Sequence, residues 1–118
     1  MKQIVKPWGY EYLLECNEHY DLKFIFIKKG EELSKQYHEK KHETLHLAQG
    51  EIEISYGKKD EDLITKNIMT KKILSDKTIV LEPNTIHKIK ALDDTWIIEA
   101  STPELDDVVR LEDKYDRC

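Results

Sequence analysis

Hydrophobic residues along this chain come in short runs, of about four to eight residues, separated by polar, turn-forming groups. The runs are rich in β-branched and aromatic side chains, a composition that favours strands over helices. In the run that begins at Glu51, the apolar residues Ile52, Ile54 and Tyr56 alternate with polar ones, as in a strand with one buried face. Eight runs predict strands, over Tyr10 to Glu15, Leu22 to Lys28, Thr44 to Gln49, Glu51 to Tyr56, Ile64 to Thr70, Thr78 to Leu81, Ile86 to Leu92 and Trp96 to Ser101.

The breaks between the predicted strands contain residues typical of tight turns. They include Gly30, Gly50, Gly57, the segment Glu82-Pro83-Asn84 and the pair Asp93-Asp94. Evenly spaced strands with short turns favour an antiparallel sandwich or a closed barrel, whose interior can hold a ligand. We therefore predict an all-β fold, a small antiparallel barrel.

The last segment, Thr102 to Cys118, has a different composition. It is dense in charged residues, and its apolar residues are spaced as on one face of a helix. Thr102 followed by Pro103 suits the cap and first turn of a helix. The sequence thus predicts a short amphipathic C-terminal helix packed on the barrel, within a single domain over residues 1–118.

The charge balance argues against a nucleic-acid partner. The chain has 24 acidic and 19 basic residues, a formal net charge of −5, and such a surface repels a phosphate backbone. No leader-like segment and no long apolar run is present, so we expect no membrane partner. Two cysteines are too few for a disulfide framework, which suits a reducing compartment. These observations predict a soluble, cytoplasmic protein.

Histidines are concentrated in one short stretch. His38, His42 and His46 fall within nine residues, together with Glu43. Imidazole and carboxylate are both good ligands for zinc, manganese, iron, cobalt or nickel. In an extended strand Glu43 would share a face with His38 only if a bulge or turn lay between Lys40 and Glu43. A metal site built from this stretch therefore requires an irregular backbone there.

Four segments resemble motifs of one protein family. Residues 34–43, followed by Gly50, resemble the first cupin motif, and residues 82–87, which end at His87, resemble the second. Residues 6–11 and 106–117 resemble the opening and closing signatures of the type II mannose-6-phosphate isomerase domain, which also occurs fused to mannose-1-phosphate guanylyltransferases. The four segments follow the family order and span nearly the whole chain. The resemblance implies a cupin barrel.

The resemblance also implies a divalent metal held by His38, Glu43 and His87. The remaining ligand position, normally a second histidine two residues after the first, is occupied by Lys40. A protonated ammonium has no lone pair to donate, so Lys40 indicates either a three-ligand site open to water and substrate or the loss of the metal. Substitution by His42 is a further possibility. The same pattern also resembles small cupins of nucleotide-sugar pathways.

As function, the resemblance implies the interconversion of a phosphorylated aldose and ketose, such as mannose 6-phosphate. That reaction moves a proton between adjacent carbons through an enediolate, which a cation stabilises. The residues implied in catalysis are Arg110, Lys40 and Glu43. Gln36, Lys41 and Arg110 are implied in binding the sugar phosphate.

Several alternatives remain open from the sequence. Arg110 is equally well explained by an ion pair with a nearby aspartate, and Trp8 and Tyr10 by core packing instead of stacking on a sugar. The chain is also consistent with an accessory cupin that binds a sugar or nucleotide-sugar without turnover, or with a metal-dependent oxygenase or lyase. A homodimer is expected by resemblance, and the apolar run Phe24 to Ile27 suits its interface. The aspartates considered for Arg110 are Asp106, Asp107 and Asp113.

Overall fold

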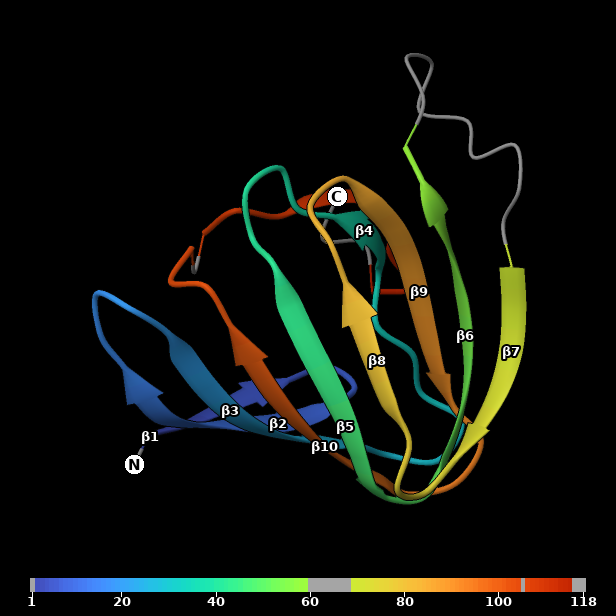
Figure 1. Cartoon of the computed structure of the whole chain (residues 1–118). Coiled ribbons are helices and arrows are strands. Elements are labelled where there is room, and N and C mark those ends of the chain that lie inside the picture. The colour runs from blue at the N-terminus through green and yellow to red at the C-terminus, as the bar shows by residue number, and fades with distance from the viewer. Residues whose placement is uncertain (1, 60–68, 105, 116–118) are drawn as a thin grey trace.

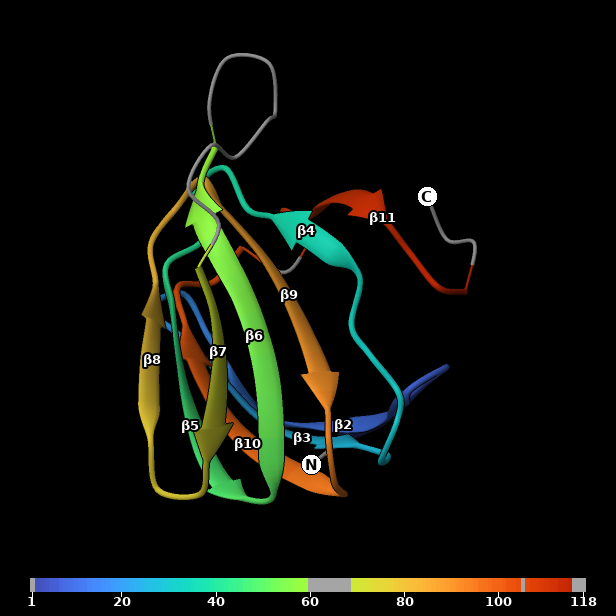
Figure 2. The same cartoon turned by 90° about the vertical axis from the view of Figure 1, so that its right-hand side faces the viewer.

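The computed structural model describes residues 2–59, 69–104 and 106–115. All regular secondary structure in these residues is β-strand, and every strand pairing is antiparallel. The strands form two sheets that face each other (Figures 1 and 2). The six-stranded sheet has the order β1 (Lys2–Lys6), β2 (Gly9–Cys16), β3 (Asp21–Ile27), β10 (Thr95–Ser101), β5 (Glu43–Gln49) and β8 (Thr78–Leu81). The five-stranded sheet has the order β11 (Val109–Glu112), β4 (Lys35–Tyr37), β9 (Thr85–Ala91), β6 (Glu51–Lys58) and β7 (Met69–Leu74).

The core lies between the two sheets and follows from alternation along the strands. On β6, Ile52 and Ile54 are fully buried while Glu53 between them is exposed, as the sequence predicts. Burying each such side chain stabilises the fold by about 1.5–3 kcal/mol. The core cluster is completed from both sheets by Trp8, Ile25, Ile27, Leu45, Leu47, Leu81, Ile89, Ala91 and Ile97.

The structure confirms the all-β barrel and seven of the predicted strands to within about two residues. The eighth prediction, Ile64 to Thr70, falls mainly on residues 64–68, which lie outside the described residues, and β7 begins at Met69. Three strands of the described residues, β1, β4 and β11, were not predicted. The three residues of β4 are too few to form an alternating pattern.

The predicted C-terminal helix is wrong. The described part of the segment is extended and contains β11, which pairs with β4. Val108 and Arg110 both line the interior cavity. They are two residues apart, as expected in a strand, where every second side chain points to the same face. The short strand β4 leaves an edge that β11 covers, and this tertiary pairing overrides the helix-like spacing of the apolar residues. Nothing in the described part of the chain forms an apolar helix of membrane-spanning length.

Gly9 shows why the opening segment needs a glycine. Its φ of 154° is rare for other residues, and a Cβ at this position would overlap the carbonyl oxygen of Phe26 on β3. The missing side chain lets β2 approach β3 closely. Gly9 thereby fixes the position of Trp8, which is buried at the edge of the core, and of Glu11, whose side chain faces the interior.

Candidate functional site

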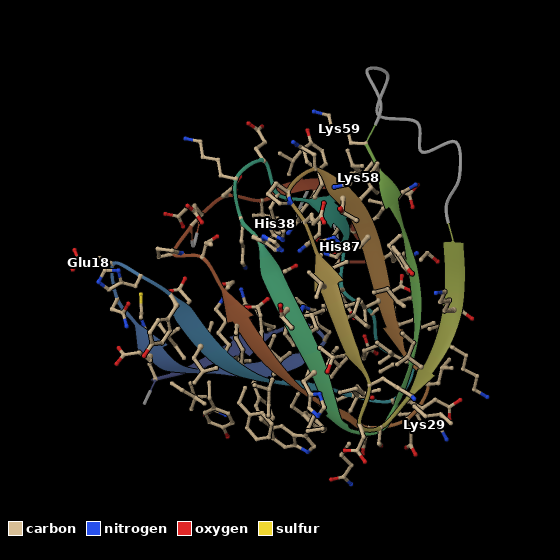
Figure 3. All side chains as sticks on the ribbon, viewed as in Figure 1. Glu18, Lys29, His38, Lys58, Lys59 and His87 are labelled. Carbon is tan, nitrogen blue, oxygen red and sulfur yellow. The ribbon has the colours of Figure 1, made fainter. Side chains whose placement is uncertain are left out.

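Three predicted ligands converge between the sheets. His38 follows β4 directly, Glu43 is the first residue of β5, and His87 lies within β9. The Nε2 atoms of His38 and His87 are each 3.5 Å from Oε1 of Glu43, and one ligand atom from each residue lies within 4.8 Å of the others. All three residues are buried, and Figure 3 shows the two imidazoles near each other. Residues 38–42 belong to no strand, which is the irregularity that convergence requires.

Main-chain carbonyl groups hold both imidazole rings in one orientation. Nδ1 of His38 contacts the carbonyl oxygen of Asp107, and Nδ1 of His87 lies 3.0 Å from the carbonyl oxygen of Thr85. A nitrogen that faces a carbonyl carries a proton, so in the neutral imidazole the lone pair is on Nε2, which faces the interior. Burial lowers the pKa of His87 despite the attraction of Glu43, so His87 is neutral at neutral pH.

The carboxylate of Glu43 stays ionised although it is buried. Burial by itself raises its pKa, but hydrogen bonds from His38 and Glu99 and the charge of Lys41 outweigh burial and hold the pKa well below its usual range. Burial lowers the pKa of Lys41, and the carboxyl groups of Glu99 and Glu43 reverse that effect and raise it. Burial and the neighbouring Glu43 raise the pKa of Glu99 to about 8, so Glu99 holds a proton at neutral pH.

Amino and carboxyl groups alternate across the inner face of the six-stranded sheet. Successive N–O separations along this series are 3.9, 3.7, 3.9, 3.7 and 3.4 Å. These distances exceed the 2.7–2.9 Å of a strong charge-assisted hydrogen bond. The series, which we call the polar row, is Lys6, Glu11, Lys23, Glu99, Lys41 and Glu43.

The polar row and the three predicted ligands line one interior cavity of about 130 Å³. Ser34, Gln36, Val108 and Arg110 line the cavity from the side of β4 and β11. Apolar residues of the core complete the lining: Trp8, Ile25, Leu33, Leu45, Ile89 and Ile97.

Asp107 joins the C-terminal segment to the loop that carries the ligands. Its carboxylate accepts hydrogen bonds from the main-chain N–H groups of Glu39, Lys40 and Lys41, with N–O distances of 3.0, 2.7 and 2.9 Å. Its own carbonyl oxygen faces Nδ1 of His38. One residue therefore fixes both the path of the loop and the orientation of an imidazole.

The residues predicted to bind or convert the sugar lie in different places. Gln36, Lys41 and Arg110 line the cavity, and the side-chain amide of Gln36 is 3.4 Å from Nε2 of His38. Lys40 is exposed and does not line the cavity, so its predicted catalytic role has no support from its position. His42 is also exposed, so it does not replace the missing ligand.

Arg110 lies on the side of the cavity opposite the polar row. Among the described residues none forms an ion pair with it, and its Nε is buried without a hydrogen bond to them. The alternative of an ion pair with a nearby aspartate is therefore not realised in this part of the chain. Of the aromatic candidates, Trp8 lines the cavity, whereas Tyr10 stacks on Phe26 outside it.

Sequence reasoning missed part of the cavity lining. Lys23 and Glu99 were not singled out. A usable signal was present in β10, where Glu99 stands at an inward position between the buried residues Ile97 and Ser101. A charged residue on the inward face of a strand indicates either a buried ion pair or a binding site.

Comparisons with known proteins agree with this geometry. Residues 1–113 match the family model described as Mannose-6-phosphate isomerase C-terminal. No curated protein matches the chain by sequence. Among solved structures, the capsular polysaccharide assembling protein CapF of Staphylococcus aureus superposes with a TM-score of 0.78 at 15% identity, over 95% of this chain and 32% of that one. The chain thus spans about a third of the length of CapF.

Two other solved structures share the fold. KdgF from a Halomonas species superposes with a TM-score of 0.71 at 16% identity, over 90% of this chain and 91% of that one. Oxalate decarboxylase of Lactobacillus farciminis superposes with a TM-score of 0.77 at 13% identity, over 93% of this chain and 33% of that one. At these identities the likeness concerns the fold alone. The match over residues 1–113, together with the cupin architecture of the two sheets, shows that this chain belongs to the mannose-6-phosphate isomerase C-terminal family of cupins.

Proposed function

We propose that this protein is a metal-dependent isomerase that interconverts a phosphorylated aldose and ketose of monosaccharide size. The observation that carries the proposal is the convergence of His38, Glu43 and His87 inside a polar cavity of a chain from this family. The cavity volume of about 130 Å³ favours a monosaccharide over a nucleotide-sugar.

The donor set suits a divalent first-row metal ion. Two imidazoles and one ionised carboxylate meet the ligand preferences of zinc, manganese, iron, cobalt or nickel. Separations of 3.5 Å between each Nε2 and the Glu43 oxygen suit ligands of one ion, since bonds of about 2.0–2.2 Å place two ligand atoms roughly 3–3.5 Å apart. When bound, such an ion polarises the sugar oxygens and stabilises negative charge that develops on them.

The remaining cavity residues take separate parts in substrate binding. The guanidinium Nε of Arg110 has no hydrogen-bond partner among the described residues, and a guanidinium matches the paired oxygens of a phosphate. Gln36 on β4 lies opposite Arg110 on the neighbouring strand β11 and opposite His87 on the other neighbour, β9. It therefore lies between the proposed phosphate-binding residue and a predicted metal ligand. Lys41 supplies an ammonium beside Glu43, where it stabilises negative charge on a sugar oxygen.

The proposal is tested by loading the purified protein with each of the five metals and adding fructose 6-phosphate. We expect mannose 6-phosphate to form with at least one metal, and the His38→Ala and His87→Ala variants to lose both bound metal and turnover. His46→Ala is the matched control, because His46 contacts Thr78 and lies outside the cavity lining. No mannose 6-phosphate with any metal would contradict the proposal.

A second candidate function is a cupin that binds a sugar without converting it. It is favoured by Lys40, which stands where the resemblance places a fourth ligand and is exposed. Metal analysis of the purified protein separates the two functions. Stoichiometric metal that is lost in His87→Ala supports the isomerase, whereas a metal-free protein whose melting temperature rises with a sugar phosphate or nucleotide-sugar supports the binding function.

We also propose that the protein is a homodimer that pairs through the outer face of the six-stranded sheet. Five aromatic side chains on β2, β3 and β10 stack on one another there, with ring centroids 4.6–5.9 Å apart. A contiguous, partly exposed apolar patch of this kind is typical of a protein interface. This outer aromatic face consists of Tyr10, Tyr12, Phe24, Phe26 and Trp96.

A further inference from the structure

The polar row has hydrogen-bonding capacity that the protein itself does not use. Neighbouring amino and carboxyl groups in it are 3.4–3.9 Å apart, too far for strong hydrogen bonds. The atom Oε2 of Glu99 is buried and has no hydrogen-bond partner among the described residues. Buried polar groups are costly unless they are satisfied, so an incompletely bonded row beside a cavity indicates a polar ligand.

Glu11 and Lys23 lie away from the predicted metal ligands, and Glu99 links them to Glu43, with which it forms a side-chain hydrogen bond. Glu11, Lys23 and Glu99 come from β2, β3 and β10, whereas Glu43 begins β5 at the other end of the row. Their side chains are 8–12% exposed and line the cavity. They form a polar surface of the cavity in addition to the three predicted metal ligands.

The alternation of amino and carboxyl groups along the polar row determines which chemical groups of a ligand this surface can bind. A hydroxyl group donates to a carboxyl oxygen and accepts from an ammonium, so neighbouring hydroxyls of a sugar can bridge successive members of the row. An anion is disfavoured there because carboxyl groups flank Lys23 on both sides, at 3.7 and 3.9 Å. The anionic end of a ligand is better satisfied by Arg110 on the opposite sheet.

We propose that Glu11, Lys23 and Glu99 form a subsite for vicinal hydroxyl groups of a monosaccharide or its open-chain form. The inference rests on the proposed function for the orientation of the ligand, with its phosphate toward Arg110. It adds a specificity determinant beyond the three predicted metal ligands: a sugar that lacks hydroxyls at the positions facing the row binds less tightly.

Two variants test the subsite with little risk to the fold. Lys23→Met leaves Glu11 in contact with Lys6, and Glu99→Leu leaves Lys41 in contact with Glu43, so neither isolates a buried charge. Each is expected to lower the affinity for D-mannose 6-phosphate about tenfold, as expected for the loss of one hydrogen bond to a charged or buried group. The affinity of both variants for inorganic phosphate should not change. The control variant is Lys58→Met, which removes an exposed ion pair with Glu82.

The measurements are calorimetry for the two phosphate probes and ligand-observed NMR for neutral D-mannose, with folding checked by circular dichroism. Weaker D-mannose binding by both cavity variants, at unchanged phosphate affinity, supports the subsite even if no isomerisation is found. Unchanged sugar affinity in the combined variant Lys23→Met/Glu99→Leu overturns it and assigns the row a purely structural role. Failure of the native protein to bind either sugar also overturns it.

Discussion

At the scale of single residues, the side chain of Gln36 lies beside the three candidate metal ligands. Its amide is 3.4 Å from Nε2 of His38, and a rotation of the amide by 180° would present the oxygen instead of the nitrogen. Ser34 contacts the other end of the amide at 2.5 Å, and a hydroxyl satisfies either orientation. Lys40, at the ligand position of the motif, points to solvent.

This arrangement predicts different effects for two neighbouring substitutions. Gln36→Leu should weaken binding of Co²⁺ about tenfold or more, the range seen for groups that support a metal site, and should change the visible absorption of the bound ion. Lys40→Ala should change neither, because its side chain is outside the cavity. Titration of the metal-free protein with Co²⁺ measures both, and equal effects of the two substitutions would refute the distinction.

Glu99 gives the metal-free protein a characteristic pH dependence. Its pKa is raised to about 8 by burial and by Glu43, whereas the same carboxyl in the unfolded chain ionises near its ordinary value. Between these two values the folded state holds the extra proton, so its contribution to stability is full at low pH and is lost as the pH rises through about 8.

The corresponding prediction concerns Glu99→Gln, which cannot ionise. Urea unfolding of the native protein and the variant at pH 5 and pH 8 should show that the variant gains stability relative to the native protein as the pH rises. Glu82→Gln, at an exposed position, is the control. A difference between native protein and variant that is the same at both pH values would mean that Glu99 does not hold the extra proton.

At the scale of elements, the C-terminal segment completes the site instead of covering it. β11 pairs with β4, and this pairing brings Arg110 and Val108 to the cavity. Tyr115, further along, packs against the core and contacts Glu31 through its hydroxyl. The loop of residues 38–42 therefore depends on a segment more than sixty residues away in sequence.

A substitution of Asp107 tests whether the loop of residues 38–42 depends on the C-terminal segment. Asp107→Ala removes the acceptor of three main-chain N–H groups and should destabilise the protein by about 1–3 kcal/mol, the usual cost of leaving polar groups unpaired. The exposed neighbour Asp106→Ala should cost much less. Thermal unfolding measures stability, and amide hydrogen exchange should quicken at residues 39–41 in the Asp107 variant only. Unchanged exchange there would show that the loop holds its path independently.

At the scale of the whole molecule, the two faces of the six-stranded sheet have opposite roles. The inner face carries the polar row and much of the core, and the outer aromatic face is available for pairing. Side chains alternate between the two faces, so Phe24 and Phe26 face outward while Ile25 and Ile27 are buried. The run Phe24 to Ile27 therefore offers only half of its side chains to an interface.

The dimer prediction follows from this division. Light scattering should give the mass of two chains at micromolar concentration, and Trp96→Glu should shift the protein to the monomer because it places a charge in the centre of the aromatic face. Lys71→Glu on β7, at the edge of the other sheet, should leave the mass unchanged. A native protein that is monomeric under these conditions would exclude this interface.

The local pattern of the sequence was sufficient for seven of the strands and for the motif ligands. Alternation with a period of two predicts β6 because a strand is read from consecutive residues, and the family motifs identify His38, Glu43 and His87. The fold class, and the need for an irregular backbone between Lys40 and Glu43, both follow from such local information.

Only the tertiary structure decided which remaining side chains share the cavity. Glu11, Lys23 and Glu99 meet because β2, β3 and β10 are neighbours in the sheet, and strand order is not encoded in the period of any one strand. The C-terminal segment is a strand because β4 offers an edge to it, although its own spacing favours a helix. Pairing and burial depend on distant parts of the chain, so their energy can reverse a local preference.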